Sequence, residues 1–280
     1  MSGILYLVAT PIGNLGDFSP RAAETLETVD FIAAEDTRVS VKLLNHLGIK
    51  KQMIPYHRHN VETGGTQILD RILSGESCAL ITDAGMPAIS DPGEQLVTLC
   101  ATHDIRVIPI PGACAFVSAL AVSGLPTGRF TFEGFLAMNK KNRRVHLASL
   151  RTETRTMIFH EAPHKLLSTL CDLRDTFGAD RQISLCRELT KIHEEIIRTC
   201  LGDAVTFYET NPPRGEFVLV VAGASESDAP APTADEGLLR IQALCADGSS
   251  LRDAVRRVSD ELGLPRNVLY DLALHSDTDD

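Results

Sequence analysis

The chain has 280 residues, of which 44% are hydrophobic, and a formal net charge of −10. This length is enough for one large α/β unit, or for two domains with their own cores and a small additional module. The acidic balance excludes a protein coated in basic surface, so any contact with nucleic acid must come from a local basic patch.

Targeting signals and disulfides are not indicated. No segment approaches the ~20 consecutive apolar residues of a membrane span, and the start of the chain lacks the features of a signal peptide. The seven cysteines form no Cys-x-x-Cys pair and stand mostly in apolar runs, which indicates buried, reduced thiols. We therefore expect a cytoplasmic protein that does not associate with membranes.

Short apolar runs alternate with helical periodicity in the first part of the chain. The runs at 4–8, 31–34, 53–56, 78–82 and 106–110 predict strands, and the stretches at 21–29, 39–47, 61–73, 93–102 and 113–123 predict helices. Strands that are apolar on both faces indicate a parallel sheet covered by helices on both sides. Ligands bind such sheets beyond the carboxyl ends of the strands.

The pattern changes after the sequence Gly-Leu-Pro-Thr-Gly at 124–128, which predicts a domain junction. Strand-like runs at 156–160, 182–186, 196–200 and 217–222 then predict a second, mixed sheet. A stretch rich in proline, alanine and acid is typical of a linker, and three helical stretches follow at 238–245, 251–262 and 266–274. The expected division is 1–123, 124–223, a linker at 224–234 and a helix-turn-helix-like module at 235–280.

Three loops at predicted strand ends contain glycine and proline, at residues 10–17, 83–93 and 109–115. These residue types fix tight turns and let a ligand approach bare backbone. A single loop of this kind is usually an ordinary turn, but three on one rim predict a shared pocket. A nicotinamide site is disfavoured because the first loop lacks the G-x-G-x-x-G pattern.

These loops resemble those of the tetrapyrrole-methylase-like S-adenosylmethionine methyltransferases. Together with Ala-Ala-Glu-Asp-Thr-Arg at 33–38 and Arg-Glu-Leu-Thr-Lys at 187–191, they are similar to the branch that 2′-O-methylates a cytidine of 16S (small-subunit) ribosomal RNA. The resemblance covers almost the whole chain. It implies the two-domain α/β fold of that family with a small C-terminal helical module, a homodimer, and small-subunit ribosomal RNA or the 30S subunit as partner.

The resemblance also implies that S-adenosylmethionine lies folded between the two domains, held largely by backbone groups. The residues that correspond to its binding site are Pro11, Asp83, Ala84, Gly85, Ile89, Cys114 and Ala115. The chain departs from the family pattern at Thr82 and Met86, where the family has serine and threonine, and at Ala113, where it has a second proline. Met86 cannot make the hydrogen bond of a threonine hydroxyl.

A ribose 2′-hydroxyl is weakly acidic, so a carboxylate that accepts its proton accelerates methyl transfer by ~10²–10⁴. Glu35, Asp36 and Asp83 all follow predicted strand ends. We expect Asp36 to be catalytic, with Glu35 and Arg38 beside it. The alternative is that these acids cap helices or bind loop amides, and for Asp83 the two interpretations are equally balanced.

The densest basic cluster follows the predicted domain junction and consists of Lys140, Lys141, Arg143 and Arg144. Such a run is commonly a solvated helix face. Its position beside the predicted cleft favours contact with RNA phosphates instead.

Two histidine patterns raise the question of a metal. The sequence His-Glu-Ala-Pro-His at 160–164 matches the H-E-x-x-H zinc motif, but Pro163 disfavours the single helix that the motif requires. It predicts a strand-to-helix loop. His57 and His59 could bind metal or RNA, although a surface loop is the commoner meaning, and we expect no metal.

Two other functions remain open. A methyltransferase acting on a tetrapyrrole or another non-RNA acceptor needs an apolar bowl, which the Glu-Asp-Thr-Arg run and the basic cluster disfavour. A non-catalytic nucleic-acid-binding regulator would use the C-terminal module, whose last helix has only Arg266 as a basic residue over 266–274.

Overall fold

A computed structural model describes residues 2–225 and 233–276 of the chain. The chain divides into two compact units, Met1–Ala224 and Ser225–Asp280. No helix among the described residues is long and apolar enough to cross a bilayer.

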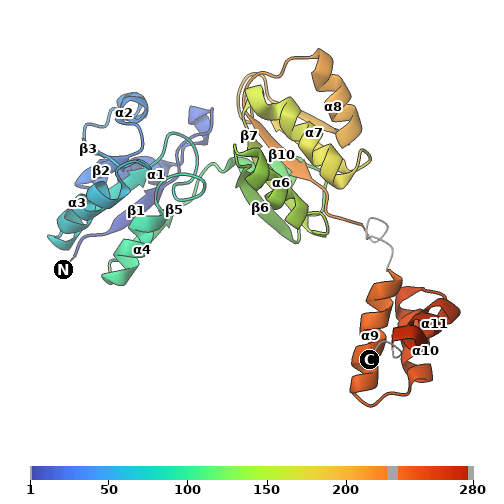
Figure 1. Cartoon of the computed structure of the whole chain (residues 1–280). Coiled ribbons are helices and arrows are strands. Elements are labelled where there is room, and N and C mark those ends of the chain that lie inside the picture. The colour runs from blue at the N-terminus through green and yellow to red at the C-terminus, as the bar shows by residue number, and fades with distance from the viewer. Residues whose placement is uncertain (1, 226–232, 277–280) are drawn as a thin grey trace. The chain divides into compact units, whose positions relative to one another are not determined.

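The first sheet of the larger unit is parallel throughout, as predicted (Figure 1). Its strands lie in the order β3-β2-β4-β1-β5. Their bounds are β1 Leu5–Val8, β2 Phe31–Ala34, β3 Gln52–Pro55, β4 Cys78–Ile81 and β5 Val107–Ile110.

Alternate residues of these strands pack against helices on opposite faces of the sheet. Phe31 and Ala33 of β2 belong to the core beneath α3 (Val61–Leu73) and α4 (Glu94–Thr102). Ile32 and Ala34 belong to the core beneath α1 (Pro20–Thr28) and α2 (Thr37–His46). Burial on both faces explains why these strands are continuously apolar.

The second sheet is mixed, in the order β6-β7-β10-β8-β9. Only β6 and β7 are parallel; the other neighbours are antiparallel. The strands are β6 Phe130–Phe135, β7 Thr156–Glu161, β8 Gln182–Arg187, β9 Glu195–Cys200 and β10 Phe217–Val221. Strand β6 was not predicted, because its register shifts between Phe132 and Gly134 and Gly134 has a φ of +63°, a bulge that interrupts the alternation.

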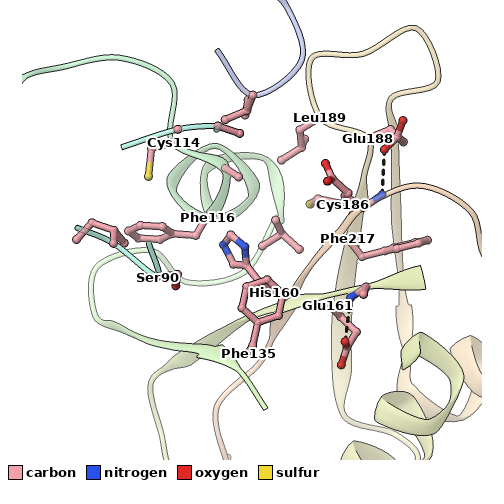
Figure 2. Close-up of a pocket in the computed structure, with 18 of the residues that line it drawn as sticks. Ser90, Cys114, Phe116, Phe135, His160, Glu161, Cys186, Glu188, Leu189 and Phe217 are labelled. Carbon is pink, nitrogen blue, oxygen red and sulfur yellow. Dashed lines mark hydrogen bonds between the residues drawn. The ribbon is translucent and has the colours of Figure 1, made fainter. Parts of the chain in front are cut away.

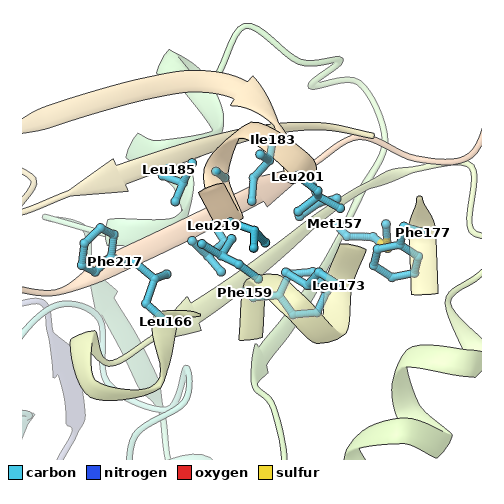
Figure 3. Packing of buried hydrophobic residues seen from close by; sticks show 14 of the residues in the cluster. Met157, Phe159, Leu166, Leu173, Phe177, Ile183, Leu185, Leu201, Phe217 and Leu219 are labelled. Carbon is cyan, nitrogen blue, oxygen red and sulfur yellow. The ribbon is translucent and has the colours of Figure 1, made fainter. Parts of the chain in front are cut away.

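One face of the second sheet is covered by α6 (Lys140–Ser149), α7 (Leu166–Phe177) and α8 (Leu201–Thr210). Phe159 of β7 and Leu219 of β10 lie fully buried in this core with Leu173 of α7 (Figure 3). The opposite face packs on α5 (Ala115–Val122), through Ala119 and Leu120. Helix α5 follows the last strand of the first sheet, so it joins the two sheets into one unit.

The smaller unit contains α9 (Ala234–Ala246), α10 (Leu251–Leu262) and α11 (Arg266–Ser276), which confirms the three predicted helices. They pack around a core of their own that includes Ile241, Val258 and Leu269. Ser250 caps the start of α10, and Gly263 ends it with a φ of +66°. Most of the predicted linker, residues 226–232, lies outside the described residues.

Candidate functional site

The three predicted loops meet at the carboxyl edge of the first sheet. Thr10 and Gly85 exchange two backbone hydrogen bonds, which join the loops after β1 and β4. A Cβ atom placed on Gly112 would lie 2.9 Å from the Cβ atom of Ala9, so the loop after β5 touches the end of β1. The shared rim is therefore confirmed.

Gly85 stands where these loops converge. Its φ of +85° belongs to the left-handed region that favours glycine. A Cβ atom there would lie 3.5 Å from Cγ2 of Ile12 and 3.7 Å from the carbonyl oxygen of Ala113. A methyl group there would therefore make ordinary van der Waals contacts, and any larger side chain would occupy part of the space around which the loops converge.

A main cavity of about 400 Å³ opens beside these loops and extends to the second sheet (Figure 2). Five of the predicted cofactor residues line it: Ala84, Gly85, Ile89, Cys114 and Ala115. Met86, a departure from the family pattern, also lines it. Pro11 and Asp83 instead line a second cavity of about 240 Å³.

Aromatic side chains form one wall of the main cavity. Phe116 and Phe132 stack with ring centroids 4.4 Å apart, and His160 lies 5.3 Å from the centroids of both Phe132 and Phe135. Figure 2 shows the His160 ring beside Phe135. Burial lowers the pKa of His160, so the ring is neutral at neutral pH, and its Nε2 has no hydrogen-bond partner in the described part of the chain. This wall suits a flat or cationic group.

The H-E-x-x-H pattern does not form a metal-binding helix. His160 and Glu161 lie on β7, whereas His164 belongs to the 3-10 helix Pro163–Lys165. The Glu161 carboxylate is used within the fold, because it accepts hydrogen bonds from Thr169 Oγ1 and the Ala162 amide. The predicted strand-to-helix loop is confirmed.

Residues of the segment 187–191 line one end of the main cavity, where Glu188 and Lys191 place a carboxylate and an ammonium group. The carboxylate of Glu188 accepts hydrogen bonds from Lys191 Nζ at 2.9 Å and from the Glu216 amide at 2.9 Å. These bonds lower the pKa of Glu188. Burial would lower the pKa of Lys191, but its bonds to Glu188 and Glu216 raise it overall. The ammonium is therefore fixed in its charged form.

Three carboxylates gather at the other end of the site. The Asp36 amide donates to Asp83 Oδ1 at 3.2 Å, and the Asp83 amide donates to Glu35 Oε2 at 3.5 Å, so the loops after β2 and β4 are cross-linked. Burial raises the pKa of Glu35 and of Asp83. Burial, together with the charges of Glu35 and Asp83, raises the pKa of Asp91 to about 6.

Among these acids, Asp91 lines the main cavity. It was not among the predicted catalytic residues, although it belongs to the Asp-Pro-Gly sequence quoted for the resemblance. Its acidic neighbour Asp83 belongs to the same loop, but Glu35 comes from the loop after β2, and the burial of Asp91 depends on the fold, so no local pattern identified it.

The structure favours the capping interpretation of Asp36. Its carboxylate caps α2 by accepting the Arg38 amide at 2.8 Å, and it pairs with Arg38 Nη2 at 2.6 Å. These bonds hold the pKa of Asp36 at about 2, which makes it a weak base. Neither Asp36 nor Arg38 lines the main cavity.

The basic cluster begins helix α6 and divides into two groups. Lys140, Lys141 and Arg144 are exposed. The expectation for Arg143 needs correction: it is only 8% exposed, its Nε pairs with Asp172 Oδ2 at 2.6 Å, and its Nη2 donates to Thr169 Oγ1 at 2.8 Å. Arg143 therefore holds α6 against α7 and is not available to RNA.

Three relatives match nearly the whole chain. A protein of Synechocystis sp. is 49% identical over 99% of both chains, and one of Xylella fastidiosa is 46% identical over 96% of this chain and 98% of its own. One of Escherichia coli O157:H7 is 42% identical over 97% and 95%. All three are named ribosomal RNA small subunit methyltransferase I.

Solved structures share the fold at low identity. Uroporphyrin-III-C-methyltransferase from Thermus thermophilus is 18% identical with a TM-score of 0.56, over 79% of this chain and 94% of its own. Diphthine synthase is 13% identical with a TM-score of 0.61, over 81% and 92%.

Two family descriptions match separate parts of the sequence. Residues 231–276 match the RsmI C-terminal HTH domain. Residues 4–205 match the Tetrapyrrole (Corrin/Porphyrin) Methylases, and this range contains the first sheet, every strand of the second sheet except β10, and most of the residues that line the main cavity. The chain therefore belongs to the tetrapyrrole (corrin/porphyrin) methylase family.

Proposed function

We propose that the chain is an S-adenosylmethionine-dependent methyltransferase of 16S ribosomal RNA that modifies the 2′-hydroxyl of a cytidine ribose. The observation that carries the proposal is the match to proteins named ribosomal RNA small subunit methyltransferase I, one of which is 49% identical over 99% of the chain. The cytidine and the 2′-hydroxyl are what the resemblance of the sequence motifs to that branch of the family implies.

The main cavity fits the cofactor. Its volume of about 400 Å³ lies within the ~300–1,000 Å³ of small-molecule sites. Gly85, Ala84, Cys114 and Ala115 would hold the cofactor by bare backbone, and His160, whose Nε2 has no hydrogen-bond partner among the described residues, lines the same space. When bound, S-adenosylmethionine supplies a methyl group on a positively charged sulfur.

The protein's contribution is positioning and proton transfer. Rigid loops that align the acceptor hydroxyl can supply ~7–11 kcal/mol of the barrier reduction. Asp91 is the carboxylate that we assign to accept the hydroxyl proton. With a pKa of about 6 it is ionised at neutral pH, yet it is a stronger base than an ordinary aspartate.

The RNA surface is proposed to include the exposed Lys140, Lys141 and Arg144 of α6. Arg38, whose side chain is 89% exposed although it pairs with Asp36, lies near the loops of the first sheet. These cations can pair with phosphates although the whole chain is acidic. The C-terminal unit is proposed to dock the ribosomal substrate.

We also propose that the protein acts in the cytoplasm as a homodimer. All seven cysteines are free, in keeping with a reducing compartment. Met138 and Ile192 are 82% and 98% exposed, and a second copy of the chain would cover such apolar side chains.

The decisive experiment incubates the purified chain with methyl-labelled S-adenosylmethionine and either 30S subunits or a tetrapyrrole. We expect label in the 16S RNA, at one ribose that becomes resistant to alkaline hydrolysis. Label in the tetrapyrrole alone would assign the chain to the other acceptor class. Absence of label with both acceptors, despite cofactor binding, would favour a non-catalytic role.

A further inference from the structure

The second cavity is lined by residues with buried polar atoms that have no hydrogen-bond partner in the part of the chain that the structure describes. It is lined by the loop after β1, the first turns of α2 and the end of β4. Ser40 and Thr82 are 3% and 2% exposed, and neither Ser40 Oγ nor Thr82 Oγ1 has a hydrogen-bond partner among the described residues. By contrast, the neighbouring Thr10 Oγ1 donates to the Thr82 carbonyl at 3.0 Å. Buried hydroxyls are normally paired, so these two point to a ligand.

The remaining lining identifies the kind of ligand. Pro11, Val39, Leu15 and Leu43 give the cavity apolar walls, and Leu15 and Val39 are 48% and 38% exposed although large and apolar. Lys42 also lines the cavity and forms no ion pair within the described chain. Apolar walls, two lining residues with unpartnered hydroxyls and a cation suit a flat heterocycle with polar edges and a nearby phosphate, which describes a nucleotide.

Consecutive residues of two loops line the two cavities. Pro11 and Asp83 line the second cavity, whereas the residues that follow them, Ile12 and Ala84, line the main one. The Thr10–Gly85 bridge fixes both loops at this division. Groups bound in the two cavities would therefore lie at a fixed distance and orientation from each other. Two neighbouring nucleotides of one RNA strand require such a fixed geometry.

We propose that the second cavity binds an unpaired nucleotide of the substrate RNA adjacent to the one that is methylated. Its base lies between the apolar walls with its polar edge toward Ser40 and Thr82, and its phosphate lies toward Lys42. Enzymes that modify nucleotides commonly take bases out of the stack into such pockets. The inference rests on the proposed methylation of RNA.

The kinetic test removes both hydroxyls in the double variant Ser40→Ala/Thr82→Val. Each lost hydrogen bond should raise KM for 30S subunits roughly 5-fold, while kcat and the Kd of S-adenosylmethionine stay unchanged. Because the hydroxyls have no partners in the free protein, the melting temperature should not fall. Thr131→Val is the matched control, since Thr131 Oγ1 is buried and unpartnered on β6 but lines neither cavity.

A binding test does not depend on catalysis. Cytidine 5′-monophosphate should shift the methyl NMR signals of Leu15, Val39 and Leu43 in the parent and in Thr131→Val, but not in the double variant. Unchanged KM in the double variant, or a weakened Kd for S-adenosylmethionine, would overturn the proposal, the second by assigning the cavity to the methyl donor. If the parent methylates no RNA but the nucleotide still shifts these signals, the proposed function fails while the nucleotide site stands.

Discussion

Thr10 and Gly85 bind each other through two backbone hydrogen bonds, with the Thr10 amide 2.9 Å from the Gly85 oxygen and the Gly85 amide 3.1 Å from the Thr10 oxygen. The pair belongs to loops after neighbouring strands, β1 and β4. Because main chain and not side chains makes this link, the loop geometry depends on what conformation each residue permits. A substitution of Gly85 should therefore disturb the loop geometry of the proposed cofactor site.

We expect Gly85→Val to abolish S-adenosylmethionine binding in calorimetry. The branched side chain would meet Ile12 and the Ala113 carbonyl and fill the space beside them. Gly48→Val is the matched control, because Gly48 also has a positive φ, +71°, but no atom lies within 4 Å of its Cβ position. Normal affinity in Gly85→Val would remove this loop from the site.

The second prediction concerns Asp91 and pH. If it accepts the hydroxyl proton, kcat should fall as the pH drops below about 6, where Asp91 becomes protonated. Asp91→Asn should lower kcat by a factor within ~10²–10⁴ and remove this acid limb. Glu35, Asp83 and Arg58 also act on Asp91, so Glu35→Gln should move the limb to lower pH without abolishing it. An unchanged limb in Asp91→Asn would assign the titration to another group.

Stability provides an independent check on Asp91. The folded-state pKa is raised, so the group favours the folded state at low pH, and that contribution is lost as the pH rises from about 4 through about 6. Asp91→Asn should therefore gain stability relative to the parent above pH 6 and lose this advantage below pH 4. Denaturant unfolding at the two pH values measures the difference.

Asp36→Ala should affect the fold more than the chemistry. Asp36 caps α2 and pairs with Arg38, and its pKa is lowered to about 2. A lowered pKa contributes stability above about pH 4 that is lost as the pH falls toward 2. The variant should melt at a lower temperature near neutrality, and the deficit should vanish in acid, with kcat little changed. A large loss of kcat at unchanged stability would restore Asp36 as a catalytic candidate.

The basic residues of α6 should separate into two phenotypes. Arg143→Ala removes a buried guanidinium together with its bonds to Asp172 and Thr169, and should cost ~1.5–3 kcal/mol of unfolding free energy. The triple variant Lys140→Ala/Lys141→Ala/Arg144→Ala should leave stability unchanged but weaken RNA binding. Each lost phosphate contact should reduce, by ~0.7–0.9, the slope of the logarithm of the RNA-binding constant against the logarithm of the salt concentration. An unchanged slope would mean that the three side chains are simply solvated.

The contrast within α6 also shows what the sequence could and could not predict. Periodicity identified the parallel sheet because β2 and β4 are buried on both faces. Leu147, four residues after Arg143, is also buried, so the helical spacing indicated that Arg143 lies on the buried face of α6. The prediction of an exposed basic cluster considered only the charges and missed this indication. No such signal exists for Asp91, or for the unpartnered hydroxyls of Ser40 and Thr82, because their surroundings come from loops that only the folded sheet brings together.

The last prediction is that the C-terminal unit docks the substrate and is not needed for the catalytic fold. Its helices bury Ile241, Val258 and Leu269 in a core of their own, while the larger unit has separate cores around its two sheets. A chain that ends at Ser225 should therefore keep its melting transition and its affinity for S-adenosylmethionine, but show a raised KM for 30S subunits. Full-length Val258→Asp, which places a charge at a fully buried position, should reproduce the raised KM by unfolding this unit alone. If either variant loses cofactor affinity, the C-terminal unit supports the catalytic core, and its assignment to substrate docking is wrong.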